Sequence, residues 1–465
     1  MDYSAANTGL WGIVVQLGTI AAAILVSTLL RRKIPLVRKS LMPTAVIAGF
    51  LLLLLQNLGV IKIDLELMEM ITYHGIAIGF IALSLRIPDR TEEDRGNLVG
   101  LKSGALIVST YLMQAILGLT ISLLLSFTVM PDLFKASGIL LPMGYGQGPG
   151  QANNVGSSYE SLGFAGGRSF GLSLAAAGYL CACVIGVIYI IILNKKGKLS
   201  KRTHDEISGS VTIDAYQDEG EIPISESVDK FSVQMALVVI VYLLTFLAAK
   251  GITGLLSSAA PGLAATLSPI IWGFNFILGS VIAILVRVLL KNFKRIKWMT
   301  RQYQNNYLLS RISGLAFDLM IVAGIASIRI EDLAGLWAPF VLMAVSGGVA
   351  TLFYLQWLAK KIYPDYYYEG LTSMYGMLTG TISSGVLLLR EIDPEMKTPA
   401  ANNLVLGSSF AIIFGAPMLI LIGMAPKSTV MTFVVYGIIL VYWALLILLI
   451  EKAKRRKKAP SATDN

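Results

Sequence analysis

The chain has 465 residues, of which 55% are hydrophobic and 14% are charged, and its formal net charge is +10. This composition excludes an ordinary soluble protein, because stretches almost free of charge recur and approach the ~20 residues that a helix needs to cross a bilayer. It also excludes a nucleic-acid-binding protein, since the basic residues lie in short segments between those stretches, as the positive-inside rule describes. The chain is predicted to be an all-α polytopic membrane protein.

Eleven apolar stretches are predicted to be membrane-spanning helices. In chain order they are 10–30, 41–60, 67–87, 103–130, 167–193, 231–250, 265–290, 307–328, 333–358, 402–425 and 428–450.

Two further segments, about 137–160 and 370–390, are interrupted by glycine and polar residues. Residues 144–150 alone hold four glycines and a proline, which would cost a continuous helix ~7 kcal/mol in intrinsic propensity. Broken backbone survives in a membrane only where protein or a water-filled cavity satisfies its N–H and C=O groups. Both segments are therefore predicted to be re-entrant hairpins, which enter and leave on one side.

The basic residues indicate the orientation. With the N-terminus outside, most of them fall on the cytoplasmic side, in 31–39, 86–102, 195–230, 287–301, 360–361 and 452–458. The outside keeps few of them: Lys62, Lys135, Lys250, Arg329, Lys427 and, at the end of a span, Arg168. If either hairpin crossed fully, the loops after it would change side and this asymmetry would be lost. The C-terminus is therefore predicted to be cytoplasmic.

Five spans and one hairpin thus occur twice, in opposite orientation. The predicted repeats are 10–193 and 231–426, joined by a cytoplasmic linker at 194–230. An eleventh span at 427–450 and a basic tail at 451–465 follow. Inverted repeats with broken elements near the bilayer midplane are typical of secondary transporters.

The first interrupted segment offers hydrogen-bonding groups for a small anion. Half-helix N-termini carry partial positive charge and hold carboxylates, and amide side chains both donate and accept. The substrate-binding candidates here are Gly146, Gln147, Gly148, Gln151, Asn153 and Asn154.

The second segment adds hydroxyl groups and flexible glycines. Freed carbonyls, hydroxyls and half-helix C-termini coordinate Na⁺, so we expect Thr379, Thr381 and Ser383 as sodium ligands. Gly380, Ser383 and Ser384 are expected to contact the substrate. The alternative for any one side chain is that it satisfies only the backbone of its own hairpin.

Asp318 lies inside the eighth span, where a carboxylate costs ~2.5–3.5 kcal/mol on insertion scales. We expect it to balance a cation such as Na⁺ or to carry a proton; the alternative is pairing with a core amide or with Arg311. Gln114 and Asn275 are expected to form hydrogen bonds between helices. Arg168 and Arg390 are interpreted as interface anchors in preference to carboxylate clamps. No metal site or cofactor is predicted.

Several motifs together resemble the bacterial sodium/glutamate symporter family over nearly the whole chain. They are Tyr145–Gln151 with Glu160–Phe164, Gly376–Thr381 with Leu387–Pro394, and Phe317–Met320 leading to Ile330–Leu333. The chain departs from that family at both interrupted segments, where a Gly-Gly-His-Gly-Thr-like and a Gly-His-Cys-Gly pattern would be expected.

The resemblance implies sodium-coupled uptake of glutamate or a related small carboxylate. It implies a multi-pass protein of the bacterial inner membrane, a homodimer in membrane lipid with a fixed scaffold, and an elevator-like transport domain. Alternatives are a proton-coupled transporter of another organic anion and a transporter-like substrate sensor. An enzyme is not expected, because serine-hydrolase elbows, His-Glu-x-x-His helices and a Walker A motif are absent from the sequence.

Overall fold

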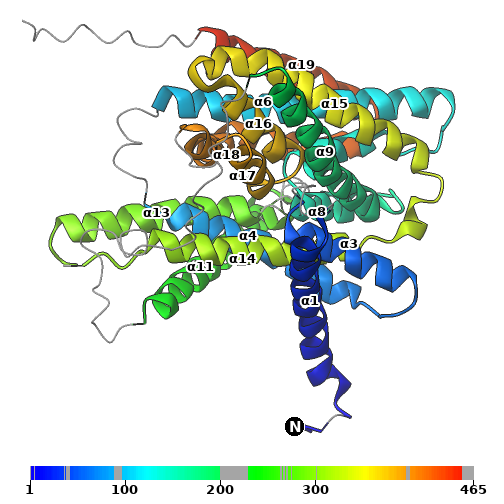
Figure 1. Ribbon diagram of the computed structural model, residues 1–465. Helices are drawn as coiled ribbons and strands as arrows, with labels where there is room; N and C mark the ends of the chain where they lie inside the picture. Colours follow the sequence, from blue (N-terminus) through cyan, green and yellow to red (C-terminus); the bar gives the residue numbers. More distant parts are fainter. Residues whose placement is uncertain are drawn as a thin grey trace, which may run out of the picture.

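The computed structural model describes residues 2–4, 6–35, 37, 42–87, 97–198, 229–261, 264, 268, 271–273, 275–299, 301–393 and 398–452. Every regular element in these residues is a helix (Figure 1). Ten of the described helices are long and apolar enough to cross a membrane, and α3 is a shorter apolar helix. The prediction of an all-α polytopic membrane protein is confirmed at this level.

Eleven of the described helices coincide with the eleven predicted spans. They are α1 (Thr8–Lys33), α3 (Thr44–Asn57), α4 (Leu65–Leu85), α6 (Asn97–Thr128), α9 (Gly167–Lys195), α11 (Lys230–Ala259), α13 (Asn275–Arg295), α14 (Asn306–Ala326), α15 (Trp337–Ile362), α18 (Ala400–Met424) and α19 (Thr429–Lys452). Short 3₁₀ turns connect some of them: η2 (Ile330–Leu333), η3 (Pro364–Tyr366) and η4 (Ala425–Lys427).

Two boundaries differ from the prediction. The second span is shorter than 41–60, because Pro43 caps α3 and the chain turns through Gly59 at a φ of 72°, in the left-handed region that favours glycine. Helix α13 begins ten residues after the predicted start at 265, and several residues of that interval lie outside the described part of the chain. Most of the predicted linker, 199–228, and the tail from 453 onward also lie outside it.

Both interrupted segments are pairs of helices with a break between them. In the first, η1 (Lys135–Ile139) and α7 (Leu140–Tyr145) precede the break and α8 (Pro149–Glu160) follows it. In the second, α16 (Tyr367–Thr379) precedes the break and α17 (Ile382–Arg390) follows it. We call Gly146–Gly148 the first break and Gly380–Thr381 the second break. Pro149 at the first position of α8 fits a helix start, where its missing N–H costs nothing.

The helices form two bodies. The first body contains α1, α3, α4, α11, α13 and α14, and α4 and α14 pack together along its centre. The second body contains α6, α7, α8, α9 and α15 to α19. Figure 1 shows α4, α11, α13 and α14 below α6, α15, α16 and α18. The main contact between the bodies is made by α8, which packs on both α4 and α14.

Close approaches of backbone hold the second break in place. A Cβ added to Gly178 of α9 would lie only 2.2 Å from the carbonyl oxygen of Thr379, the last residue of α16. A Cβ added to Gly385 of α17 would lie 2.5 Å from the carbonyl oxygen of Ser373 of α16. Small residues at membrane helix contacts allow such approach. The position of the second break therefore depends on glycines in two different helices.

We predict that Gly178→Ala destabilises the protein, because the new methyl group has to displace the Thr379 carbonyl; overpacking of this kind costs ~1–3 kcal/mol. The control is Gly437→Ala on α19, where an added Cβ meets nothing within 4 Å. Thermal unfolding of both purified variants in detergent measures the difference. A melting temperature of Gly178→Ala equal to that of Gly437→Ala would contradict this packing.

Candidate functional site

The two breaks, more than 230 residues apart in the chain, are in contact. Gly148 has a φ of 84°. A Cβ added there would lie 3.5 Å from Thr381 Cγ2 and 3.8 Å from the Gly380 carbonyl oxygen. Glycine is favoured at this position by its positive φ, and the space beside it borders the second break.

Four helix ends meet at this point. Helices α7 and α16 end at the breaks, and α8 and α17 begin there. The first N–H groups of α8 and α17 have no acceptor inside their own helices, and helix starts carry partial positive charge. The last carbonyl groups of α7 and α16 carry partial negative charge. The breaks thus offer donors for an anion and acceptors for a cation in the same small region.

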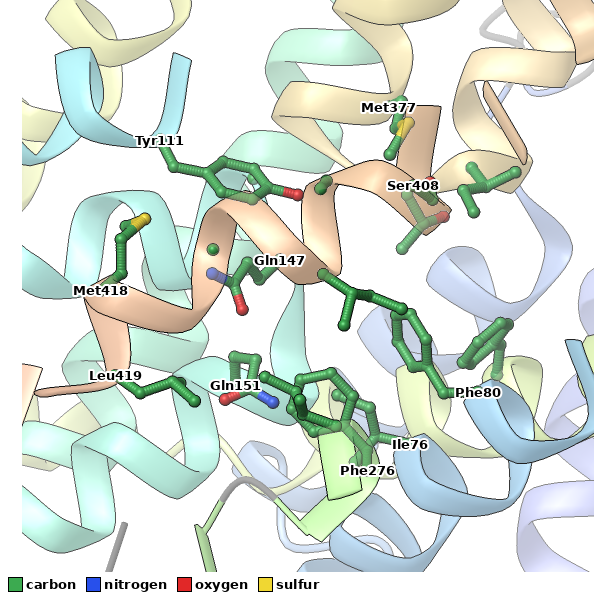
Figure 2. Close-up of a pocket in the computed structure, with 18 of the residues that line it drawn as sticks. Ile76, Phe80, Tyr111, Gln147, Gln151, Phe276, Met377, Ser408, Met418 and Leu419 are labelled. Atoms are coloured by element: carbon green, nitrogen blue, oxygen red, sulfur yellow. The ribbon is translucent and has the colours of Figure 1, made fainter. Parts of the chain in front are cut away.

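A cavity of about 110 Å³ opens beside the breaks, where the two bodies meet. The breaks line it through Gly146, Gln147, Gly380 and Thr381, and the first turn of α8 adds Gln151. The first body lines it through α4, α13 and α14, and the second body adds residues of α6 and α18. Figure 2 shows Gln147 and Gln151 next to each other, between Tyr111 on one side and Ile76 and Phe276 on the other.

Several polar atoms around the breaks are buried without a hydrogen-bond partner in the protein. Gln151 is 1% exposed, and both atoms of its amide lack a partner. The Ser384 hydroxyl is in the same condition. The hydroxyls of Thr381 and Tyr179 interact with each other and have no further partner among the described residues. Buried polar atoms are nearly always hydrogen-bonded, so this group indicates a place where a ligand, an ion or water supplies the missing partners.

The other predicted residues of the first segment have different surroundings. Asn153 is buried and its Oδ1 has no partner, but it does not line the cavity. The Asn154 side chain is engaged elsewhere: its Nδ2 donates to the Gly273 carbonyl oxygen at 2.6 Å, just before α13. Asn154 thus joins α8 to the first body.

Among the predicted sodium ligands, Thr379 is fully buried and donates its hydroxyl to the Tyr375 carbonyl at 2.7 Å, which leaves the oxygen able to accept. Ser384 Oγ lies beside Gly380, since it is 2.8 Å from where a Cβ on that glycine would be. The side chain of Ser383 lies outside the described part of the structure.

Asp318 is not a lining residue, although its neighbours Phe317 and Met320 are. Its side chain is exposed on α14, and its carboxylate lies within electrostatic range of the Tyr179 hydroxyl. Among the described residues it forms no hydrogen bond or ion pair. Arg311 is stacked over the Tyr307 ring, 4.9 Å from its centroid, so the alternative of an Asp318–Arg311 pair is not what the structure has.

Sequence reasoning missed several lining residues, including Tyr111, Phe276, Ser408 and Met418. Each belongs to a helix that reads as an ordinary apolar span. No local signal distinguishes the face of such a helix that borders a cavity from the face that borders lipid.

Gln114 forms the predicted hydrogen bonds between helices. Its Nε2 donates to Thr351 Oγ1 of α15 at 3.0 Å and to the Leu378 carbonyl oxygen at 2.9 Å. Leu378 is in the last turn of α16, whose carbonyls have no intrahelical donor. Gln114 therefore fastens α6 and α15 to the helix end at the second break. Asn275 likewise donates to the Tyr242 hydroxyl, at 3.3 Å.

Arg168 lies away from the cavity in a charged cluster at the start of α9. Its guanidinium forms an ion pair with Glu69 of α4. Its backbone N–H donates to Glu160 Oε1 at 3.0 Å. Burial raises the pKa of the Glu160 carboxyl, and that N–H opposes the shift. Ser169 donates to Asp332 Oδ2 at 2.8 Å. The cluster ties the start of α9 to α4, to the end of α8 and to η2. Arg390 is exposed at the end of α17.

No protein-family model matches the chain, and none of the curated proteins compared with it matches either.

We predict that Gln114→Met destabilises the protein, because it leaves the buried Leu378 carbonyl without its donor; such a loss costs ~1–3 kcal/mol. Thr351→Val is the matched comparison, since it removes one partner of Gln114 and leaves the bond to Leu378 in place. Thermal unfolding should rank wild type above Thr351→Val and Thr351→Val above Gln114→Met. The reverse order of the two variants would mean that the carbonyl finds another donor.

Proposed function

We propose that the protein is a sodium-coupled secondary transporter of a small carboxylate, with elevator-type alternating access. The observation that carries the proposal is the contact between the two breaks at a cavity lined by both bodies. Matched interruptions of two hydrophobic segments are the usual place of substrate and ion sites in transporters. The resemblance to the sodium/glutamate symporter family points the same way.

The carboxylate is placed at the starts of α8 and α17. Both helices have unsatisfied N–H groups there, and both turn their positive ends to the cavity. Gln151 lies on the first turn of α8, and both atoms of its amide lack a partner. Thr381 lies at the cap of α17, with its hydroxyl beside that of Tyr179. A carboxylate accepts from donors of this kind at charge-assisted strength.

Sodium is placed at the opposite helix ends, where α7 and α16 finish. Carbonyl oxygens and the hydroxyls of Thr379 and Thr381 are hard oxygen donors that suit such a cation, and Ser383 and Ser384 follow on α17. Asp318 supplies the negative charge that balances the cation. Its carboxylate lies within electrostatic range of the Tyr179 hydroxyl, which borders the second break. Substrate and ion would then share the breaks, and the charge of one would favour binding of the other.

The proposed topology has two inverted repeats, each with a re-entrant hairpin. Contacts between helix ends support this topology. The basic residues assign each helix end to one side of the membrane, and ends assigned to the same side contact each other. On the proposed outer side, Arg168 pairs with Glu69 and Ser169 with Asp332. On the proposed cytoplasmic side, Lys361 pairs with Glu451, Asn403 donates to Tyr366, and Arg287 donates to the Arg86 carbonyl.

The two bodies support the elevator movement. Each repeat contributes its first three spans to the first body, and its fourth span, broken segment and fifth span to the second. The first body would be the scaffold and, as the resemblance implies, the dimer contact in the bacterial inner membrane. The second body would carry both breaks across the bilayer.

Proton coupling is the second candidate. The observation that favours it is Asp318, an exposed carboxylate on a membrane helix with no cation beside it among the described residues. A group of this kind is suited to exchange protons with water in a crevice.

We predict that both broken segments return to the side that they enter from. In a background without Cys181 and Cys183, Asp132→Cys and Leu162→Cys should both react with an impermeant thiol reagent added outside intact cells. Pro364→Cys and Arg390→Cys should react only after the cells are opened. All four positions are exposed. Labelling of Asp132→Cys and Leu162→Cys from opposite sides would refute the inverted repeats.

We predict that Na⁺ stabilises the purified protein and that Asp318→Asn removes this effect, since binding to the folded state raises stability by mass action. The measurement is the melting temperature in sodium chloride against choline chloride at equal ionic strength. Asp318→Glu keeps the charge and should retain part of the Na⁺ effect.

The same measurement distinguishes the proton-coupled alternative. That alternative requires no Na⁺ effect in the wild type, together with a pH dependence of the melting temperature that Asp318→Asn abolishes. An Na⁺ effect of full size in Asp318→Asn would exclude Asp318 from the ion site.

A further inference from the structure

The wall of the cavity carries no charged residue among the residues of the described chain that line it. Thirteen of them are apolar: Ile76, Phe80, Phe276, Ile277, Phe317, Met320, Met377, Ile382, Ala411, Ile412, Met418, Leu419 and Ile422. A charge buried against such a wall is costly unless it is paired and hydrogen-bonded. The wall therefore suits an apolar group and offers no counter-charge for a second carboxylate.

The groups that can hold a carboxylate are confined to one place. The starts of α8 and α17 come together at Gly148 and Thr381, where a Cβ on the glycine would lie 3.5 Å from Thr381 Cγ2. Since both positive helix ends meet there, one carboxylate can accept from both of them. If the substrate carried a second carboxylate at its other end, that group would lie among Phe80, Phe276 and their apolar neighbours.

The amide of Gln151 favours a ligand that has a hydrogen-bond donor next to its carboxylate. Its Nε2 needs an acceptor and its Oε1 needs a donor, and the protein supplies neither. The side chain is 1% exposed and lies in the cavity wall (Figure 2). A carboxylate with a hydroxyl or amino group on the adjacent carbon satisfies both atoms, because the carboxylate accepts and the adjacent group donates.

The size of the cavity agrees with a small ligand. An apolar protein cavity of about 150 Å³ holds benzene, and this one measures about 110 Å³. A short apolar side chain fills such a space, whereas the side chain of glutamate adds a second charge to it.

We infer that the substrate is a small monocarboxylate with a hydrogen-bond donor on its second carbon and an apolar side chain, and not a dicarboxylic amino acid. This inference rests on the proposed function and narrows its substrate. Phe276, Ile76 and Met418 contact the apolar side chain, and Gln151 and Thr381 hold the polar end. The substrate specificity follows from the uncharged wall that the described lining residues form.

The test is binding to the purified full-length protein in sodium chloride, measured by calorimetry. The probes are 2-hydroxyisovalerate, valine and glutamate, and the first two separate a hydroxy acid from an amino acid. We expect at least one of these two to bind at least tenfold more tightly than glutamate. Binding of glutamate as tight as or tighter than both would overturn the inference and leave the proposed carboxylate transporter standing. Binding of none of the three would count against both.

Variants locate the site. Gln151→Leu is expected to weaken binding of the preferred probe at least tenfold, and Thr381→Val, which keeps the side-chain shape, is a second route to the same loss. The matched control is Gln56→Leu at the end of α3, a glutamine that does not line the cavity. Its affinity should equal that of the wild type. Wild-type affinity in a folded Gln151→Leu or in Thr381→Val would place the ligand elsewhere.

Discussion

The structure depends on one constraint: backbone that leaves the helical path inside an apolar environment has to find hydrogen-bond partners within the protein. This chain breaks two helical segments and then places the breaks against each other. Gly178 permits the approach, because a Cβ there would lie 2.2 Å from the Thr379 carbonyl oxygen, and Gly148 supplies the positive φ of the first break. Gln114 reaches from α6 to satisfy the Leu378 carbonyl, one residue before the end of α16. Of the polar groups left without a partner around the breaks, the amide of Gln151 lies in the cavity wall.

The same constraint explains why function and folding use the same residues here. A plain helix satisfies its own backbone and has nothing left to offer a solute. A break exposes N–H groups at one end and carbonyl groups at the other, which suits an anion and a cation respectively. The surrounding helices need only keep lipid out and hold the ends in place. The apolar wall formed by Phe80, Phe276 and Phe317 serves both purposes in the first body.

Much of the fold could be predicted from the sequence, because lipid imposes a simple rule on composition. Each predicted span overlaps a helix, and the breaks occur where glycines and Pro149 made a continuous helix too costly. The site was predictable only in part. Gly146, Gln147 and Gln151 stand out as polar or flexible residues in an apolar segment, and all three line the cavity. Tyr111, Phe276 and Ser408 do not stand out, because their role comes from tertiary packing. Asn154 and Thr379 show the converse, since their polar groups also bind neighbouring backbone.

The ion pair between Arg168 and Glu69 joins α9 of the second body to α4 of the first. Its two partners are unequal: the Arg168 side chain is 11% exposed and that of Glu69 is 39% exposed. Any sliding of one body along the other separates the two charges. Glu69 then gains water easily, whereas Arg168 stays desolvated until its surroundings open as well. Loss of this ion pair would therefore cost more at Arg168, whose charge is buried, than at Glu69. This contact would resist displacement of α9 from α4, and neither of its residues lines the cavity.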